Sequence, residues 1–321
     1  MNNYSWLQQR LHQLALSSQF MREATFDVES SIVLPVNAND NHVFIAGLAR
    51  SGSTILLNAI YQSDAFASLT YADMPFVLSP NFWAKISSNK KHKKAVERAH
   101  GDGIKVSTKS PEAFEEVFWR TFDDSDSESL KKFKTFVQLI SHKYQKNRYL
   151  SKNNQNIRRL ELIAELFPDA KILIPFREPA QHAYSLLTKH KKFIKNSKND
   201  SFISKYMQWI GHTEFGPNYI PIHNKNLNFK DDEDINHWVE QWYLTYKECQ
   251  ESLQANKNVQ FVCHEKLCQS KEYWFEILNF IAIDTKYEFA FKESKRDLST
   301  VIDENLNQKT SAIYNQLRCY T

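Results

Sequence analysis

Short hydrophobic runs alternate with amphipathic segments along much of the chain. The short runs are apolar and rich in β-branched and aromatic residues, which predicts buried strands at HVFIAGLA (42–49), KILIPF (171–176) and NVQFVCHEKL (258–267, with its exit loop). Apolar residues at helical spacing predict helices at STILLNAIYQ (53–62), IRRLELIAELF (157–167), PAQHAYSLLTKHKKF (179–193), DEDINHWVEQWYLTYKECQESLQ (232–254) and YWFEILNFIAI (273–283). Strands separated by helices pair in parallel through crossover connections.

The remaining segments have shorter or weaker patterns. We expect a short strand leaving into a loop at FASLTYADMPF (66–76), an extended segment ending in a turn at YLSKNNQN (149–156), a helix starting at Pro111, and amphipathic helices in 1–20 and 130–144. The whole pattern predicts the α/β class, with a P-loop-like parallel β-sheet flanked by helices and with helical insertions. We expect a single domain over 1–321, with core motifs in 43–190 and helical and C-terminal elements in 200–321.

Composition and net charge indicate which classes of ligand and partner the protein can bind. The 321 residues are 42% hydrophobic and 24% charged, which is ordinary for a globular protein, and the net charge of +4 permits an anionic ligand without requiring one. The basic cluster at 90–94 has no accompanying aromatic pattern for base stacking, so a solvated helix face is favoured over a nucleic-acid partner. Oligomeric state is not readable from the sequence.

Cysteine usage and hydropathy suggest a location. All four cysteines lie in the last third of the chain, without CxxC pairs or zinc-like spacing, and we interpret them as free thiols in a reducing compartment. The N-terminal segment lacks the continuous apolar core of a signal peptide, and no apolar window is long enough to span a membrane. We therefore expect a cytoplasmic protein without a membrane span.

The segment GLARSGST, from Gly47 to Thr54, has the spacing of a phosphate-binding loop. Glycine is scarce, with 6 in the whole chain, and two of them bracket this short turn between a predicted strand and a predicted helix. The free N–H groups of such a helix start can hold an anion. The lysine that a nucleoside-triphosphate loop needs is replaced by Ser53, and the nearest cation is Arg50. The candidate anion-binding residues are Arg50, Ser51, Gly52, Ser53 and Thr54.

A second anion-binding unit is predicted in IPFREPAQHAYS (174–185). Arg177 stands at the end of a predicted strand, and Ser185 lies two turns into the following helix. An arginine and a hydroxyl so placed can converge on one phosphate. The alternative is a surface arginine and a helix serine that share no ligand.

Taken in order, these elements resemble the sulfotransferase family. The resemblance spans Val43 to Thr188 and extends weakly to NVQFVCHEKL; FPDAKIL (167–173) and SPEAFEEVFW (110–119) are also similar to family sequences. It implies that the loop from Arg50 to Thr54 holds the 5'-phosphosulfate of the donor 3'-phosphoadenosine 5'-phosphosulfate (PAPS), and that Arg177 and Ser185 hold its 3'-phosphate. It also implies that Lys152, in YLSKNNQN, lies near the reacting sulfuryl group.

The sequence departs from the family at the catalytic base. Cytosolic members have a histidine two residues after that lysine, whereas this chain has Asn154, whose amide cannot take up a proton at neutral pH. Other branches use an acidic residue after the phosphosulfate loop, a place that Asp73 fits. Glu112 and His182 are the alternatives.

The resemblance implies transfer from PAPS to a hydroxyl or amine of a small-molecule or glycan acceptor, in line and without a metal, with 3'-phosphoadenosine 5'-phosphate (PAP) as the product. Asp73 is expected to act as the base, with Lys152 and Arg50 as catalytic cations. One rival is a P-loop phosphotransferase using ATP and magnesium, which needs the missing lysine and a strand-end aspartate. Another is a catalytically inactive nucleotide-binding protein.

The acceptor is not identified by the sequence. Aromatic residues in 79–83, 207–219 and 236–246 could line an acceptor pocket, although at helical spacing such residues more often form core. His212, Glu214 and His237 are polar residues in these segments to which the sequence assigns no partner.

Overall fold

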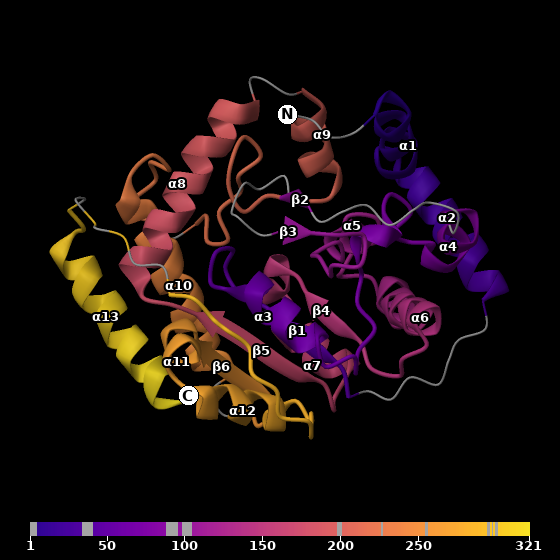
Figure 1. Ribbon diagram of the computed structural model, residues 1–321. Helices are drawn as coiled ribbons and strands as arrows, with labels where there is room; N and C mark the ends of the chain where they lie inside the picture. The colour runs from indigo at the N-terminus through magenta and orange to yellow at the C-terminus, as the bar shows by residue number, and fades with distance from the viewer. Residues whose placement is uncertain are drawn as a thin grey trace.

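A four-stranded parallel sheet lies at the centre of the computed structural model, which describes residues 5–33, 41–87, 96–97, 105–197, 201–225, 227–253, 256–293, 296, 298 and 301–321. The sheet has the strand order β4-β1-β5-β6 (Figure 1), formed by β1 (Val43–Ile45), β4 (Leu150–Lys152), β5 (Lys171–Phe176) and β6 (Val259–Cys263). At the carboxyl end of β1, Ile45 lies opposite Lys152 of β4 on one side and Leu173 of β5 on the other. The predicted parallel α/β architecture is confirmed.

The strands are apolar on both faces because helices cover both faces. Successive residues alternate between two cores: Phe44 and Ile172 belong to one, and Ile45 and Leu173 to the other. The second core is completed by α3 (Ser53–Tyr61) and α12 (Lys271–Phe280). The first core includes side chains of α6 (Ser127–Tyr144), α7 (Leu160–Leu166), α10 (Ile235–Leu253) and α13 (Glu304–Cys319).

Further helices extend this central unit. A third apolar cluster joins α8 (Pro179–Ser197) to α10, and α13 lies alongside α10 at one edge of the molecule (Figure 1). The remaining elements are α1 (Trp6–Leu16), α2 (Gln19–Ile32), α4 (Pro80–Ser87), α5 (Glu116–Trp119), α9 (Ser201–Trp209), α11 (His264–Gln269), the 3-10 helices η1 (Tyr71–Asp73) and η2 (Asn154–Arg158), and an antiparallel pair of short strands, β2 (Val96–Glu97) and β3 (Lys105–Val106). The basic cluster at 90–94 falls outside the described residues.

Three local predictions were wrong. The exit loop expected after the strand that ends at Cys263 is instead the helix α11, which begins at His264. The segment 66–76 does not form a strand; it has isolated bridges at Ala67 and Thr70 and then turns into η1. Thr70 and Asp73 form a capping box there, and such side-chain bonds to the backbone compete with strand pairing. The helix expected from Pro111 begins only at Glu116, because Pro111 is bridged to Thr70 instead.

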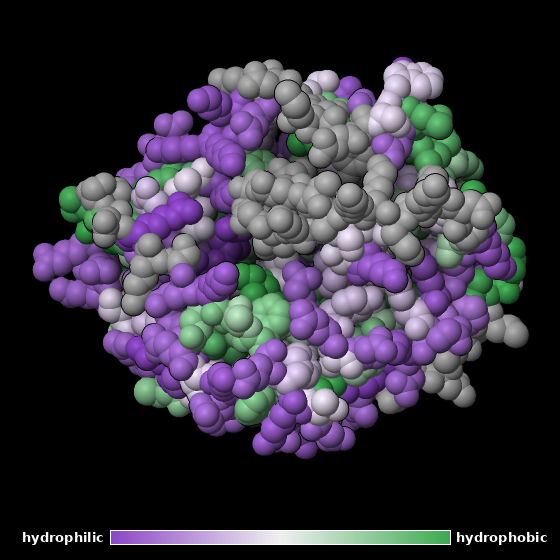
Figure 2. Space-filling view, in the orientation of Figure 1, coloured by the Kyte–Doolittle hydropathy of each residue, from purple (hydrophilic) through white to green (hydrophobic). Residues whose placement is uncertain are grey.

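The surface is largely polar, with apolar areas in several places, one of them on the side where α1 and α2 lie (Figure 2). Exposed apolar side chains on these two helices include Trp6, Leu7 and Phe20. None of the helices in the described residues is long and apolar enough to cross a membrane.

Candidate functional site

The loop between β1 and α3 is packed tightly against the ends of two neighbouring strands. A Cβ on Gly47 would lie 3.0 Å from the carbonyl oxygen of Pro175 in β5, and a Cβ on Gly52 would lie 2.8 Å from Nδ1 of His264, directly after β6. Gly52 has a φ of 96°, which favours glycine, and it is the N-cap of α3. The two glycines that made this segment conspicuous are therefore required by close approach and by backbone conformation.

The start of α3 suits an anion. The N-cap of α3 is Gly52, which has no side chain to cap the N–H groups of the first turn. Ser53 and Thr54 form that first turn, and the positive end of the helix dipole points in the same direction. Arg50 precedes the turn with a φ of 72°. These groups fit the phosphosulfate end of a donor such as PAPS.

The second predicted unit lies beside this loop. Nε of Arg50 donates a hydrogen bond to Oγ of Ser185 on α8, with a distance of 3.3 Å. Arg177 directly follows β5; burial lowers the pKa of its guanidinium, while the nearby carboxylates of Glu265 and Glu178 raise it. Arg50 and Ser185, which are 135 positions apart in the chain, are thus in direct contact.

His182, on α8, forms a hydrogen bond to the backbone of the loop between β1 and α3. Its Nε2–H donates to the carbonyl oxygen of Ala49 at 2.7 Å, and the ring is fully buried. Burial, with smaller contributions from the charges of Arg177 and Arg50, lowers the pKa of His182 from 6.5 to about 3, although the hydrogen bond to Ala49 raises it. The imidazole is therefore neutral at physiological pH, and both arginines lie near enough to act on it electrostatically. This geometry gives His182 a clear part in holding the loop.

Lys152 and Asn154 lie at the adjacent strand end. Lys152 is the last residue of β4 and is buried, and the N–H of Asn153 donates to the carbonyl oxygen of Ile45 at 3.2 Å. In η2, Oδ1 of Asn154 accepts a long hydrogen bond of 3.5 Å from Oγ of Ser53. The loop, Lys152 and the arginine unit all lie at the carboxyl edge of the sheet, where open α/β sheets bind ligands.

Asp73 lies in a different environment. Its fully buried carboxylate accepts hydrogen bonds from the N–H of Thr70 at 2.6 Å and from Oη of Tyr144 at 2.8 Å, and it forms an ion pair with Lys143. Burial and, next, the Asp73 charge raise the pKa of Tyr61, the last residue of α3, which is about two helical turns from Ser53. The assignment of Asp73 as the catalytic base stays a prediction.

Glu112 also has structural partners. One carboxylate oxygen accepts from Oη of Tyr71 at 2.9 Å, and the other accepts from the N–H of Ala113 at 2.9 Å. It lies in the loop before α5, beside the bridge between Thr70 and Pro111. Its role as an alternative base is likewise a prediction.

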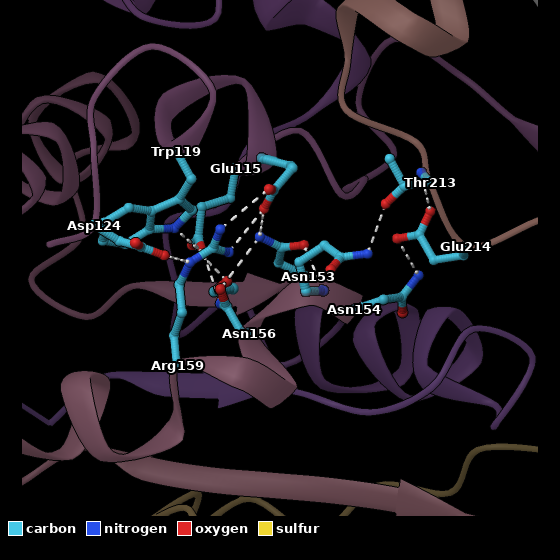
Figure 3. A network of polar contacts seen from close by, with 12 residues as sticks. Glu115, Trp119, Asp124, Asn153, Asn154, Asn156, Arg159, Thr213 and Glu214 are labelled. Carbon is cyan, nitrogen blue, oxygen red and sulfur yellow. Dashed lines mark hydrogen bonds and ion pairs between the residues drawn. The ribbon is translucent and has the colours of Figure 1, made fainter. Parts of the chain in front are cut away.

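The structure brings Glu214 to the edge of this site, which sequence reasoning did not expect. Figure 3 shows a polar network that extends from Asp124 and Arg159 through Asn153 to the segment with Thr213 and Glu214. Nδ2 of Asn154 donates to Oε1 of Glu214 at 3.3 Å, and Nε2 of Gln155 donates to Oγ1 of Thr213 at 2.9 Å. No local pattern signals this contact, because it joins residues 60 positions apart.

The sequence analysis also did not identify His264 and Glu265, which directly follow β6, as site residues. His264 packs against Gly52, and the carboxylate of Glu265 acts on the pKa of Arg177. The signal was present in the sequence, since polar residues directly after a buried strand lie at the same sheet edge as the other strand ends. Among the described residues, no three His, Cys, Asp or Glu side chains lie together in a group that could hold a metal ion.

Comparison with known proteins identifies the family. The model of the family described as "Sulfotransferase family" matches residues 42–286, more than half of the chain. The chain belongs to the sulfotransferase family. This membership supports sulfuryl transfer in general, and the parallel sheet with its strand-end loop is the P-loop-like fold predicted. None of the curated proteins matches the chain.

Several solved structures are similar to this sulfotransferase. The crystal structure of sulfotransferase STF9 from Mycobacterium avium has 11% identity and a TM-score of 0.45, covering 98% of this chain and 79% of that one. That of STF1 from Mycobacterium tuberculosis H37Rv has 11% identity and a TM-score of 0.46, covering 96% and 81%. The sulfotransferase domain from the curacin biosynthetic pathway has 10% identity and a TM-score of 0.40, covering 86% and 97%.

Proposed function

We propose that this sulfotransferase transfers the sulfuryl group of PAPS to a hydroxyl or amine of a small-molecule or glycan acceptor and releases PAP. The observation that carries the proposal is the contact between Arg50 and Ser185. It joins the loop that would hold the 5'-phosphosulfate to the unit that would hold the 3'-phosphate. A donor with phosphate groups at both positions suits two adjacent anion sites.

Each residue has a role in this proposal. The backbone N–H groups from Ser51 to Thr54 and the guanidinium of Arg50 would bind the phosphosulfate, while Arg177 and Ser185 would bind the 3'-phosphate. Lys152, at the neighbouring strand end, would stabilise charge on the transferring sulfuryl group and on the departing 5'-phosphate. The family resemblance suggests Asp73 as the base, and this proposal does not depend on which carboxylate takes the acceptor's proton.

We also propose that transfer needs no metal ion. The sulfuryl group carries less charge than a phosphoryl group, and fixed N–H groups and cations would supply the stabilisation that magnesium supplies in kinases. The four cysteines are free thiols in the structure, which suits the reducing cytoplasm proposed as the location.

The test is thermal unfolding with PAP, compared with ATP and magnesium. A ligand that binds only the folded state adds about 2.7 kcal/mol of stability at a hundred times its Kd, so PAP is expected to raise the Tm. Arg177→Ala is expected to abolish this shift, because one phosphate loses its charged partner. The matched control is Arg10→Ala, which removes an exposed arginine on α1 and should leave the shift unchanged.

A shift with ATP and magnesium, and none with PAP, would overturn the proposal and favour a P-loop phosphotransferase. A PAP shift without transfer of labelled sulfate to any acceptor in a pooled metabolite or glycan extract would instead favour a nucleotide-binding protein that has lost catalysis.

A further inference from the structure

We propose that Glu214 is the general base that takes the acceptor's proton, an inference that rests on the proposed function. Glu214 lies in the segment between α9 and α10, which comes back over the carboxyl edge of the sheet. It is the carboxylate that the described structure links to the start of α3 through a single intervening side chain, that of Asn154.

The first argument is position. Asn154 accepts from Oγ of Ser53 at 3.5 Å and donates to Oε1 of Glu214 at 3.3 Å, so its side chain bridges the anion-binding loop and the carboxylate. Asn154 belongs to η2, which begins two residues after Lys152. Glu214 is therefore adjacent to the place where the sulfuryl group would be transferred.

The second argument is available hydrogen-bonding capacity. Oε1 accepts from Asn154, and Oε2 accepts from the N–H of Thr213 at 3.0 Å. Each carboxylate oxygen has two lone pairs, so both can accept a further hydrogen bond from an acceptor O–H or N–H. The side chain is 11% exposed, which leaves it partly shielded but reachable.

The third argument is the contrast with Asp73. That carboxylate is fully buried, capped by Thr70 and Tyr144 and paired with Lys143, so taking a proton from an acceptor would require it to leave these partners. Glu214 has no lysine or arginine ion pair in the described residues; its ionic neighbour is Nδ1 of His212 at 3.6 Å.

His212 also links the carboxylate to a pocket. The ring of His212 stacks on Phe193, and both line a small pocket of about 40 Å³. Its other lining residues are both apolar and polar, among them Ile203, Met207, Phe215, Asn196, Ser197 and Asn218. A pocket of this size would admit a small group of an acceptor rather than a whole molecule.

The step balances as a single displacement. The acceptor O–H bond breaks and its proton passes to an oxygen of Glu214, while the acceptor oxygen forms a bond to the sulfur of PAPS. The bond between that sulfur and the bridging oxygen of the 5'-phosphate breaks, and its electron pair stays on the phosphate of PAP. The protonated carboxyl then releases the proton to solvent.

The experiment compares Glu214→Gln with wild type on two probe acceptors, hexan-1-ol and 4-nitrophenol, at one mildly alkaline pH. PAP formation from PAPS is measured, with transfer to water as the background. Hexanol needs its proton removed, whereas the nitrophenol is already ionised. General-base catalysis is typically worth about a hundredfold to ten-thousandfold in rate. We expect Glu214→Gln to lower kcat/KM at least about a hundredfold for hexanol and less than about tenfold for nitrophenolate.

A surface substitution and PAP binding serve as controls. Glu251→Gln removes an exposed carboxylate on α10 and should leave both rates unchanged. The Tm shift with PAP should be the same in Glu214→Gln as in wild type, which shows an intact donor site and fold.

Two results would overturn the role of Glu214 and leave the proposed function standing: a hexanol rate equal to that of Glu251→Gln, or an equal loss for both acceptors. If wild type neither binds PAP nor forms it from PAPS, the proposed function itself fails, and the inference fails with it.

Discussion

At Gly52 the loop enters α3 with a backbone conformation that side chains rarely adopt. Its φ is 96°, and the space for a Cβ is taken by the imidazole of His264. The positive φ and the close approach of His264 therefore both require glycine at this position. The orientation of the loop's N–H groups depends on both. This is a residue-scale constraint on the donor site.

We expect Gly52→Ala to lower the free energy of unfolding by about 1–2 kcal/mol, the cost of placing an alanine in the left-handed region. It should also abolish the Tm shift with PAP, because relief of the clash with His264 moves the first turn of α3. Urea unfolding and thermal unfolding measure the two effects.

Gly216→Ala is the matched control. Gly216 has a φ of 88°, and a Cβ there would lie 2.9 Å from Cβ of Phe193. It should cost similar stability and retain the shift with PAP. An unchanged PAP shift in Gly52→Ala would contradict the role given to this glycine.

At the scale of elements, η2 is fixed between α5 and the 213–214 segment. Arg159, at the end of η2, bonds to Glu116 of α5 at 2.9 Å and to Asp124 at 2.7 Å. Its guanidinium also lies 4.9 Å from the ring centre of Trp119. Burial raises the pKa of Glu116, while the Arg159 charge lowers it. The charged form of Glu116 is therefore stabilised by Arg159.

We expect Arg159→Met to lower the free energy of unfolding by about 3 kcal/mol, because it leaves a largely buried carboxylate, with 14% of its side chain exposed, without its ion-pair partner. Lys271→Met is the control: it breaks the exposed pair between Lys271 and Glu288, and exposed pairs are worth less than about 1 kcal/mol. Urea unfolding at neutral pH measures both. Equal losses in the two variants would show that the Arg159 pair does not hold η2.

At the scale of the whole molecule, buried histidines make stability depend on pH. His42, beside β1, accepts at Nδ1 from the N–H of Tyr149 at 3.0 Å, which requires a neutral ring. Burial and, next, the charge of Arg148 lower its pKa from 6.5 to about 4. Between these two values the unfolded chain takes up a proton that the folded protein does not, so stability falls as pH falls.

His42→Asn removes this dependence and retains a side-chain oxygen as acceptor. Wild type is expected to lose about 2 kcal/mol more stability than the variant between pH 7 and pH 5, from the difference between the two pKa values. Urea unfolding at the two pH values measures the difference. The same loss in both proteins would contradict the buried, neutral state of His42.

Much of the fold was predictable from the sequence because its signals are local. Three of the four strands and the long helices follow from short apolar runs and helical spacing, and β4 lies in the segment that was expected as extended. The strand predicted in 66–76 was wrong because the side chains of Thr70 and Asp73 form hydrogen bonds to the backbone, and a hydropathy pattern does not reveal such bonds. Pro111 failed as a helix start because its partner is Thr70 of another segment.

The sequence by itself determined the α/β class, the glycine-bracketed loop after the first strand and the family, since strand runs, glycine spacing and motif order are properties of neighbouring residues. Only the tertiary structure decided which distant side chains meet. Arg50 reaches Ser185, Asn154 reaches Glu214, and Asp73 is enclosed by Lys143 and Tyr144. The physical reason is that such contacts depend on how whole helices and loops pack over the carboxyl edge of the sheet, which no local pattern encodes.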